Sequence, residues 1–434
     1  MSYPAHDSYK NSGVEWLGDV PSGWETWKIS HGFRSIGSGT TPNTNDLSFY
    51  NGDIPWVTTA ELREKRIVQT NKTVTDLALK EYSALSIYSP NALIIAMYGA
   101  TIGRLGTLGV HATVNQACCV FENPIAFDST FVFWWLQMAR PVLVTEATGG
   151  GQPNLSQDDL KSLKIPAPNV SEQKAIALFL DRKAAAIDAL IAKKEKLLEL
   201  LVEKRTALIT RAVTKGLDPT VPMEPSGIDW LGDVPEGWEV KKLKYLSSAN
   251  DETLSDTFDP DLNITYVDIS SVDLIEGIKR KETLRFGDAP SRARRVVKHG
   301  DTIISTVRTY LKAIAAIKEP EPNLIVSTGF CVIRPIELIA PDFLGYCLRS
   351  EGFIGEVVSK SVGVSYPAIN PDGIVSIKII NPPMKEQKVI ADYLANKISD
   401  LDAAKQKIYE AILKLKEYRT ALITAAVTGK IRVT

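Results

Sequence analysis

A direct internal repeat is the feature of this 434-residue sequence that most restricts how it can fold. The segment GVEWLGDVPSGWE at residues 13–25 returns with few substitutions as GIDWLGDVPEGWE at residues 227–239. At the same shift of 214 residues, Glu-Gln-Lys at 172–174 recurs at 386–388, and Arg-Thr-Ala-Leu-Ile-Thr at 205–210 recurs at 419–424. Several matches at one offset indicate a duplicated structural unit.

Between the matched blocks, residues 30–145 and 244–360 show little likeness. The chain length corresponds to roughly two to three domains at ~150 residues each. The sequence therefore predicts two divergent domains held in a duplicated frame. Functional differences between the two halves should reside in these two regions.

Each copy of the frame predicts one long helix. Helix-start signals occur at Ser171, after Pro166 and Pro168, and near residues 385–386, after two prolines. Mainly apolar residues, interrupted by lysines at 183, 194, 204 and 397, then recur at alternating spacings of four and three, which is typical of a coiled-coil seam. The predicted seam positions are 176, 180, 183, 187, 190, 194, 197, 201, 204 and 208, and in the second helix 390, 394, 397, 401, 404, 408, 411, 415, 418 and 422. About 40 residues make a helix of ~60 Å.

Each of these helices carries an apolar stripe that needs a partner, and the other helix is the simplest one. Antiparallel packing would return the C-terminus to the first domain, so that residues 13–27 serve domain one as residues 227–241 serve domain two. We therefore expect an antiparallel coiled coil and an internal pseudo-two-fold. A duplicated scaffold whose helices merely pack as a bundle is the alternative.

The variable regions predict an α+β fold with more strand than helix. Short apolar runs predict strands, and two longer stretches predict helices at 131–138 and 342–350. The expected strands lie at 54–57, 92–97, 117–121, 264–269, 302–307 and 330–333. The expected domain layout is domain one at 1–165, the first long helix at 166–215, domain two at 216–380, and the second long helix with a tail at 381–434.

The overall composition does not by itself indicate a class of binding partner. Fifty Lys and Arg against 51 Asp and Glu give a net charge of −1, so a nucleic-acid surface would need local segregation of charge. Four cysteines without a CxxC pair predict reduced thiols. No apolar run approaches the ~20 residues of a spanning helix, and the N-terminus lacks a signal-peptide core. We expect a soluble, cytoplasmic protein.

Three sets of residues suggest DNA binding. Residues 279–300 carry eight Lys and Arg against two acidic residues, and we take Arg292, Arg294 and Arg295 as candidate phosphate contacts, with a solvated surface as the alternative. In domain one, glycine-rich turns carry side chains able to read base edges, namely Tyr98, Arg104, Asn115, Gln116, Gln152 and Asn154. The corresponding loops of domain two carry Arg308, Tyr310, Lys312, Ser365 and Tyr366. Pro153 and Pro367 coincide under the repeat, which favours a shared loop with variable tip residues.

Enzyme signatures are weak. Asn381-Pro382-Pro383-Met384 is similar to the Asn-Pro-Pro-aromatic loop of adenine methyltransferases, but it ends in Met and directly precedes a helix, so a linker is the better interpretation. The sequence has neither an HExxH motif nor a Cys/His cluster. The Gly149-Gly150-Gly151 run lacks the Lys-Ser/Thr of a phosphate-binding loop.

Taken together, these blocks resemble the specificity subunit of type I restriction-modification systems. The resemblance covers essentially the whole chain and rests on Trp-Leu-Gly-Asp-Val-Pro-x-Gly-Trp at 16–24 and 230–238, Tyr-Gly-Ala-Thr-Ile-Gly at 98–103, Asn-Gln-Ala-Cys-Cys at 115–119, and the two helix motifs. It implies two target-recognition domains on an antiparallel coiled coil, each reading one half of a split double-stranded DNA target. It also implies two modification subunits that use S-adenosylmethionine and restriction subunits that use ATP and Mg²⁺, with no cofactor and no catalytic centre in this chain. A stand-alone methyltransferase and a scaffold without DNA are the rival hypotheses.

Overall fold

The computed structural model describes residues 3–147, 154–255 and 258–433. The chain folds as two compact units, one made of residues 1–193 and 411–434 and the other of residues 194–410. Each unit contains one of the variable regions and a part of both long helices. We call the variable regions with their flanking strands domain one and domain two.

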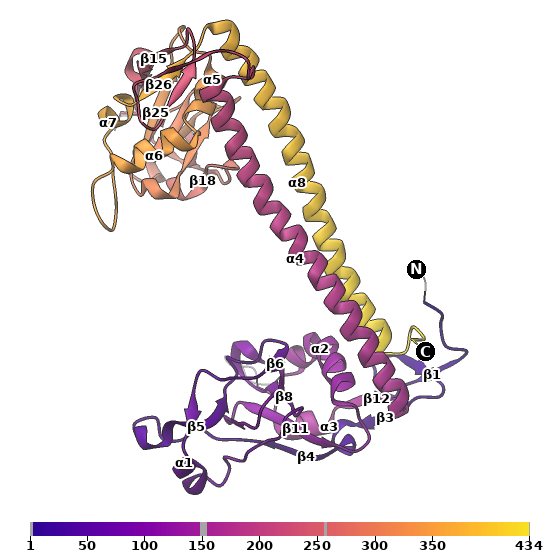
Figure 1. Ribbon diagram of the computed structural model, residues 1–434. Coiled ribbons are helices and arrows are strands. Elements are labelled where there is room, and N and C mark those ends of the chain that lie inside the picture. The colour runs from indigo at the N-terminus through magenta and orange to yellow at the C-terminus, as the bar shows by residue number, and fades with distance from the viewer. Residues whose placement is uncertain (1–2, 148–153, 256–257, 434) are drawn as a thin grey trace. The chain divides into compact units, whose positions relative to one another are not determined.

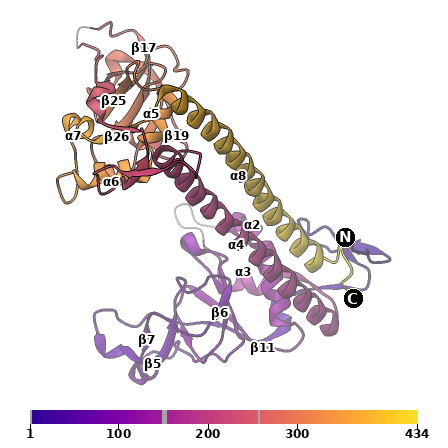
Figure 2. The same cartoon turned by 45° about the horizontal axis from the view of Figure 1, so that its top comes forward.

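The two predicted long helices are confirmed as α4 (Val170–Lys215) and α8 (Met384–Val427). In the second unit, the last turns of α4 and the first turns of α8 share one buried cluster, which includes Ile209 and Leu394. In the first unit, Asp188 of α4 accepts a hydrogen bond from Arg419, near the end of α8. In each unit the two helices therefore lie side by side and run antiparallel (Figure 1; Figure 2).

Fifteen of the twenty predicted seam positions are buried or half-buried, and five, at 190, 197, 204, 397 and 418, are exposed. Leu190 and Leu197 are each 43% exposed, whereas Ala184 and Ile191 are buried at the neighbouring positions. In α8, Ile398 and Ile412 are likewise buried in place of positions 397 and 411. A series with alternating spacings of four and three can be placed in two registers, which differ by one residue at alternate positions. Leu190 and Leu197 belong to the predicted register but are exposed, whereas the buried Ala184 and Ile191 belong to the other register.

Domain one contains a five-stranded sheet of order β4-β11-β8-β9-β6 and a three-stranded sheet of order β10-β5-β7. Its strands are β4 (Phe33–Ser38), β5 (Tyr50–Val57), β6 (Lys65–Ile67), β7 (Thr73–Val74), β8 (Leu93–Ala96), β9 (Leu105–Leu108), β10 (Thr113–Val114) and β11 (Cys118–Pro124). Its helices are α1 (Asp76–Glu81), α2 (Ser129–Glu146) and α3 (Gln157–Ser162). Helix α2 begins at Asp128, whose carboxylate accepts the backbone N–H groups of Thr130 and Phe131.

Domain two contains two four-stranded sheets, of order β16-β25-β22-β23 and β20-β17-β24-β21. Its strands are β16 (Ser247–Ala249), β17 (Asn263–Val267), β18 (Val272–Asp273), β19 (Gly277–Ile278), β20 (Glu282–Arg285), β21 (Ala293–Val296), β22 (Thr302–Ser305), β23 (Ile314–Ala316), β24 (Leu324–Ser327) and β25 (Phe330–Pro335). Its helices are α5 (Pro341–Cys347), α6 (Glu351–Ser359) and α7 (Pro371–Val375).

The two domains share a topology that their sequences do not reveal. The antiparallel series β4-β11-β8-β9 matches β16-β25-β22-β23 strand for strand. The parallel pair β5 and β10, with β7 antiparallel beside β5, matches β17 and β24 with β20. The α+β class and the six predicted strands are thus confirmed, and α2 and α5 coincide with the two predicted short helices.

The repeated tryptophan-rich segments at 13–27 and 227–241 each lie against the end of a long helix. In the first unit, β1 (Tyr9–Asn11) pairs with β2 (Asp19–Pro21), and β3 (Glu25–Lys28) pairs with β12 (Lys164–Ala167). The Tyr9 hydroxyl donates to the Gly429 carbonyl beyond α8, and the backbone N–H of Arg432 donates to the Pro4 carbonyl, so both chain ends meet there. Gly429 also lies directly against Pro21 and Trp24, so residues 13–27 receive the end of the second long helix, as predicted.

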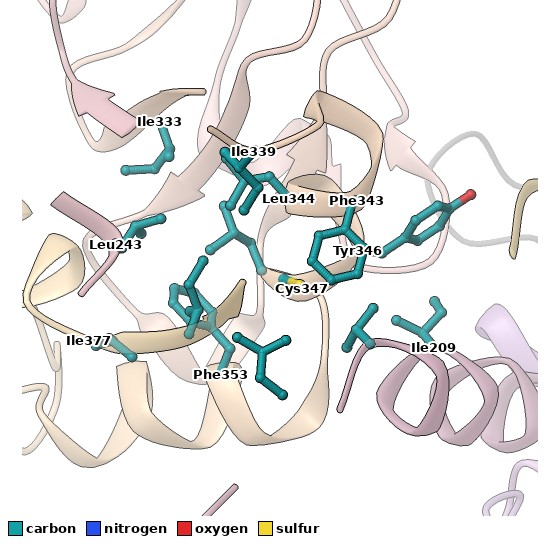
Figure 3. Close-up of a cluster of buried hydrophobic side chains, with 14 of the residues drawn as sticks. Ile209, Leu243, Ile333, Ile339, Phe343, Leu344, Tyr346, Cys347, Phe353 and Ile377 are labelled. Carbon is teal, nitrogen blue, oxygen red and sulfur yellow. The ribbon is translucent and has the colours of Figure 1, made fainter. Parts of the chain in front are cut away.

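The second unit repeats this arrangement at the end of α4. Strand β13 (Met223–Pro225) pairs with β14 (Asp233–Pro235), and β15 (Glu239–Lys242) pairs with β26 (Lys378–Asn381). The Lys215 ammonium donates to the carbonyls of Leu231 and Asp233. Figure 3 shows Ile209 of α4 facing Phe343 and Tyr346 of α5 within the apolar core of this unit.

A buried glutamine of the repeated Glu-Gln-Lys motif attaches each domain to its long helix. The Gln173 side chain accepts the Asp128 N–H at 2.7 Å and donates to the Pro168 carbonyl at 2.8 Å. Gln387 accepts the Ala340 N–H at 2.7 Å and donates to the Pro382 carbonyl at 2.8 Å. Since Asp128 and Ala340 are the N-cap residues of α2 and α5, the motif links α2 to α4 and α5 to α8.

Candidate nucleic-acid interface

Three segments far apart in the sequence of domain one meet at one point. The loop after β8 begins with Met97, whose N–H donates to the Ala117 carbonyl of the turn before β11 at 2.8 Å. The Met97 carbonyl accepts the Leu155 N–H at 2.9 Å, and Tyr98 forms an isolated antiparallel bridge with Asn154. We call this junction apex 1, made of the described residues of segments 97–104, 115–117 and 154–155.

Domain two builds the same junction. Thr306, after β22, donates its N–H to the Gly329 carbonyl at 2.8 Å and accepts the Ile369 N–H at 2.9 Å. Val307 forms an isolated antiparallel bridge with Ala368. Positions 368 and 369 are 154 and 155 shifted by 214, so the repeat extends into these loops. We call this junction apex 2, made of segments 305–312, 328–329 and 361–369.

Apex 1 presents mainly polar groups. The Tyr98 hydroxyl donates to the Gln116 carbonyl at 2.5 Å, and burial, together with the nearby Cys118, raises the pKa of Tyr98 and keeps its hydroxyl protonated. Gln116 and Asn154 are exposed, and the buried Asn115 Oδ1 atom has no hydrogen-bond partner among the described residues. These four candidates therefore lie together.

Two further candidates of domain one have different outcomes. Arg104 lies half-buried at the end of the same loop, where its carbonyl accepts the Ala96 N–H at 2.8 Å. Gln152, with the glycine run before it, lies outside the described residues. Gly99 and Gly103 adopt left-handed conformations, with φ of 69° and 72°, which explains glycine at both positions of this turn.

Apex 2 presents a cation, aromatic rings and a strained backbone. Arg308 and Lys312 have left-handed φ values of 50° and 53°, a conformation uncommon for side chains of this kind. The Arg308 guanidinium lies 4.8 Å from the ring centroid of Tyr366, and the backbone N–H of Arg308 donates to the Pro367 carbonyl at 2.7 Å. Tyr310 and Ser365 are exposed on the same loops. The structure thus brings all five candidates of these loops to one junction.

The positive charge of residues 279–300 is largely balanced in space. Five of its cations pair with carboxylates from other segments or from within the segment: Lys279 with Asp273, Lys281 with Glu321, Arg285 with Asp261 and Asp288, Arg292 with Asp268, and Lys298 with Glu252. Most of these carboxylates lie outside residues 279–300. The excess of positive charge counted along this segment is therefore larger than the net positive charge around it in the folded domain.

The three candidate arginines of this segment are engaged within the domain. Arg292 pairs with Asp268 at 2.9 Å, and Arg294 stacks on the Phe286 ring at 4.6 Å. Arg295 donates to Thr253 at 2.8 Å. Burial raises the pKa of Asp268, but hydrogen bonds from Ser270 and Tyr266 and the Arg292 charge outweigh it, so the pKa is lowered overall. Arg292 alone of the three adjoins apex 2, since its carbonyl accepts the Thr328 N–H at 2.7 Å.

One residue beside apex 1, Thr41, escaped the sequence analysis. The Thr41 hydroxyl donates to the Gln116 side-chain carbonyl at 2.6 Å, which brings the loop after β4 to the junction. Gly39 explains the close approach, because a Cβ atom there would lie 1.7 Å from the Val114 carbonyl oxygen. The Gly-Thr-Thr-Pro run at 39–42 was the available signal.

Chemically, each apex can hydrogen-bond, stack and bind anions. Within residues 3–147, 154–255 and 258–433, no group of three or more His, Cys, Asp or Glu is arranged to hold a metal ion. Among the same described residues, no helix is long and apolar enough to cross a membrane. The Asn-Pro-Pro-Met segment leads from β26 into α8, and Asn381 is buried against Gln387, as expected of a linker.

Comparisons with known proteins agree with this geometry. The family described as type I restriction modification DNA specificity domain matches twice, over residues 21–200 and 235–414. The type I restriction enzyme MjaVIII specificity subunit of Methanocaldococcus jannaschii is 27% identical, covering 95% of this chain and 94% of that protein. The MjaIX specificity subunit of the same organism is 26% identical, covering 96% and 95%.

Solved structures have the same fold. A chain from a structural study of complex assembly and conformational transition in a type I R-M system aligns with a TM-score of 0.67 and 17% identity, over 95% of this chain and 99% of that one. The HsdS subunit from Thermoanaerobacter tengcongensis aligns with a TM-score of 0.57 and 16% identity, over 95% and 98%. Because the family matches twice and each match covers one copy of the repeat, this chain belongs to the type I restriction-modification DNA specificity family.

Proposed function

We propose that each domain reads one half of a bipartite double-stranded DNA target, with apex 1 and apex 2 as the base-reading surfaces. The observation that carries this proposal is the duplicated three-segment junction, which has the same backbone bonds in both domains but different exposed side chains. A shared backbone junction that carries different exposed side chains in the two domains is what recognition of two different half-sites would need. Members of the family are specificity subunits, so this chain recognises DNA and leaves catalysis to others.

The coiled coil would set the spacing between the half-sites. Helix α4 has 46 residues, which at ~1.5 Å per residue makes it roughly 70 Å long. Half-site centres about one turn of duplex apart, or at most two at ~34–36 Å each, suit such a rod. The target would then be two short sequences separated by bases that neither domain reads. We retain residues 1–165 and 216–380 as the proposed extents of the two recognition domains.

The partners would be DNA, two modification subunits and the restriction subunits, assembled in the cytoplasm. The exposed faces of residues 172–213 and 386–427 are the proposed docking surface for the modification subunits. Because the chain carries a net charge of −1, much of the phosphate contact would come from these partners. We expect weak DNA binding by the chain alone, measured by fluorescence anisotropy with and without the modification subunit; tight sequence-specific binding in isolation would contradict this.

The proposal is tested by mapping DNA methylation in a host that carries the system. Arg104→Ala should relax recognition in one half-site only, and Arg308→Ala in the other. Lys430→Ala, an exposed lysine beyond α8 that lies outside both apices and the proposed docking surface, serves as the control and should leave the target unchanged. A change spread over both halves by either apex variant would refute the assignment.

Two further measurements address the rival functions. Calorimetric titration of the purified chain with S-adenosylmethionine should give no binding, whereas a stand-alone methyltransferase would bind it. Selection from random duplexes with the assembled complex should enrich one interrupted sequence. A scaffold indifferent to DNA would enrich none.

A further inference from the structure

Apex 2 exposes an unusual concentration of large apolar side chains. Val364 is fully exposed at 102% and Val362 is 80% exposed. More than half of each neighbouring side chain of Tyr310, Leu311 and Tyr366 is also exposed. Scattered apolar residues are normal on a protein surface, but a contiguous group of this kind marks a place where another molecule binds.

The loop that carries the valines is braced at its base. The backbone of Val362 exchanges two hydrogen bonds with that of Ala368, at 2.8 and 3.0 Å, which closes residues 363–367 into a tight loop. The Thr309 and Ser361 hydroxyls, 2.7 Å apart, join its base to segment 305–312. Figure 1 shows the connection between α6 and α7 projecting from the domain. A loop held in this way loses little conformational entropy on binding.

The packing of Arg308 on Tyr366 defines the two sides of this loop. The guanidinium lies 4.8 Å from the ring centroid of Tyr366, and Tyr366 and Val364 each lie two residues inside the pair that closes the loop. The loop therefore carries a cation on its aromatic ring and an exposed apolar side chain within a few residues of each other. A cation suits a phosphate or a guanine edge, whereas two exposed valines require an apolar partner.

The major groove of DNA offers one such partner. Its base edges present hydrogen-bond donors and acceptors, and the C5-methyl group of thymine is the only apolar group among them. Building on the proposed function, we infer that domain two identifies thymine in its half-site through contact of the Val364 side chain, flanked by Val362, with a thymine methyl group. A β-branched valine has few side-chain conformers and can present its methyl groups at little entropic cost.

The described part of apex 1 contrasts with this surface. Its exposed side chains at Gln116 and Asn154 are amides, which pair with base edges by hydrogen bonds. The two domains would therefore read their half-sites by different chemistry. That difference makes a test possible in which only one half of the target responds.

The test uses the complex of this chain with its modification subunits, after methylation mapping has defined the target. Each thymine of the domain-two half-site is replaced in turn by deoxyuridine, which lacks only the methyl group. At one position at least, the dissociation constant should rise about fourfold, the value expected for one buried methyl-sized group. The same replacement within the spacer should have no effect.

Val364→Ala provides the matching protein change. It should remove the preference for thymine over deoxyuridine. Val68→Ala, which alters a valine of domain one that is 62% exposed, should keep the preference. Because Val364 is fully exposed, its variant should also keep the wild-type unfolding midpoint.

Three results on the DNA side would overturn the inference: a domain-two half-site without an A·T pair, indifference of the complex to every deoxyuridine replacement, or a Val364→Ala complex that still prefers thymine. Loss of binding to the modification subunit by Val364→Ala would instead identify the loop as a protein contact and would equally overturn it. Failure of the proposed function is distinguishable, because the complex would then have no interrupted target at all.

Discussion

Arg205 and Asp402 form the same ion pair as Arg419 and Asp188, with the two helices exchanged. Arg205 Nη1 donates to Asp402 Oδ1 at 2.7 Å, and Arg419 Nη2 donates to Asp188 Oδ2 at 3.1 Å. A shift of 214 residues converts Asp188 into Asp402 and Arg205 into Arg419. One pair lies in each unit, so the sequence repeat is expressed as a repeated contact between antiparallel helices.

These pairs should contribute modestly to stability. Asp402 is 53% exposed while the Arg205 side chain is 11% exposed, so water screens the carboxylate and the packed arginine stem carries part of the effect. A double-mutant cycle of Arg205→Ala and Asp402→Ala, measured by urea unfolding, should give a coupling of about 0.5–1 kcal/mol. The exposed Lys196 and Glu199 pair within α4 is the control and should give less; a coupling above about 2 kcal/mol would contradict this account.

The buried glutamines should matter more than the ion pairs. Gln387→Leu leaves the Ala340 N–H and the Pro382 carbonyl without their side-chain partner, so the free energy of unfolding should fall by about 1–3 kcal/mol. Gln173→Leu should do the same in the first unit. Gln406→Ala, an exposed glutamine that bonds only within α8, should change stability by less than about 0.5 kcal/mol. Equal effects of buried and exposed variants would disprove the attachment role.

The repeat supplies a matched pair of tryptophans. Trp238 Nε1 donates to Glu386 at 2.7 Å, whereas Trp24 Nε1, at the equivalent position, is buried with no hydrogen-bond partner among the described residues. A hydrogen bond to a charged group contributes about 1.5–3 kcal/mol. Trp238→Phe should therefore reduce the free energy of unfolding by about 1.5 kcal/mol more than Trp24→Phe. If Trp24→Phe lowers the free energy of unfolding more than Trp238→Phe does, the hydrogen bond from Trp238 to Glu386 does not account for the difference between the two repeats.

The helical frame was predictable because coiled-coil periodicity is a local property. Its exact register was not, since Leu190 and Leu197 favour one phase while burial of Ala184 and Ile191 requires the other. The turn at 98–104 and the loop at 361–367 could be named from their glycines and polar residues. Their meeting points could not, because they depend on strand order. Likewise, Asp268 and Glu252 lie far along the chain from the cations that they balance.

The four cysteines predict how stability should depend on pH. All are buried, and burial raises the pKa of Cys119 and Cys331 from 9.0 to about 12 and raises those of Cys118 and Cys347 as well. In the folded chain the thiols then stay protonated at pH values where the unfolded chain ionises. The stabilisation is complete below pH 9, so the free energy of unfolding should decrease as pH rises above it, by up to about 1.4 kcal/mol per pH unit for each thiol.

Urea titrations between pH 9 and 10 emphasise this effect, because the tyrosines whose pKa burial raises, Tyr88 and Tyr98 among them, have an ordinary value of 10.0 and contribute mainly above that range. In Cys119→Ala, the free energy of unfolding should fall less steeply with pH, because one of the four thiols no longer ionises in the unfolded chain. Ellman's reagent provides an independent measure, since the native chain should react slowly at pH 8 and all four thiols should react after unfolding. Rapid labelling of native Cys118 or Cys119 would mean that β11 opens readily, and the strand next to apex 1 would then be too mobile to hold the junction.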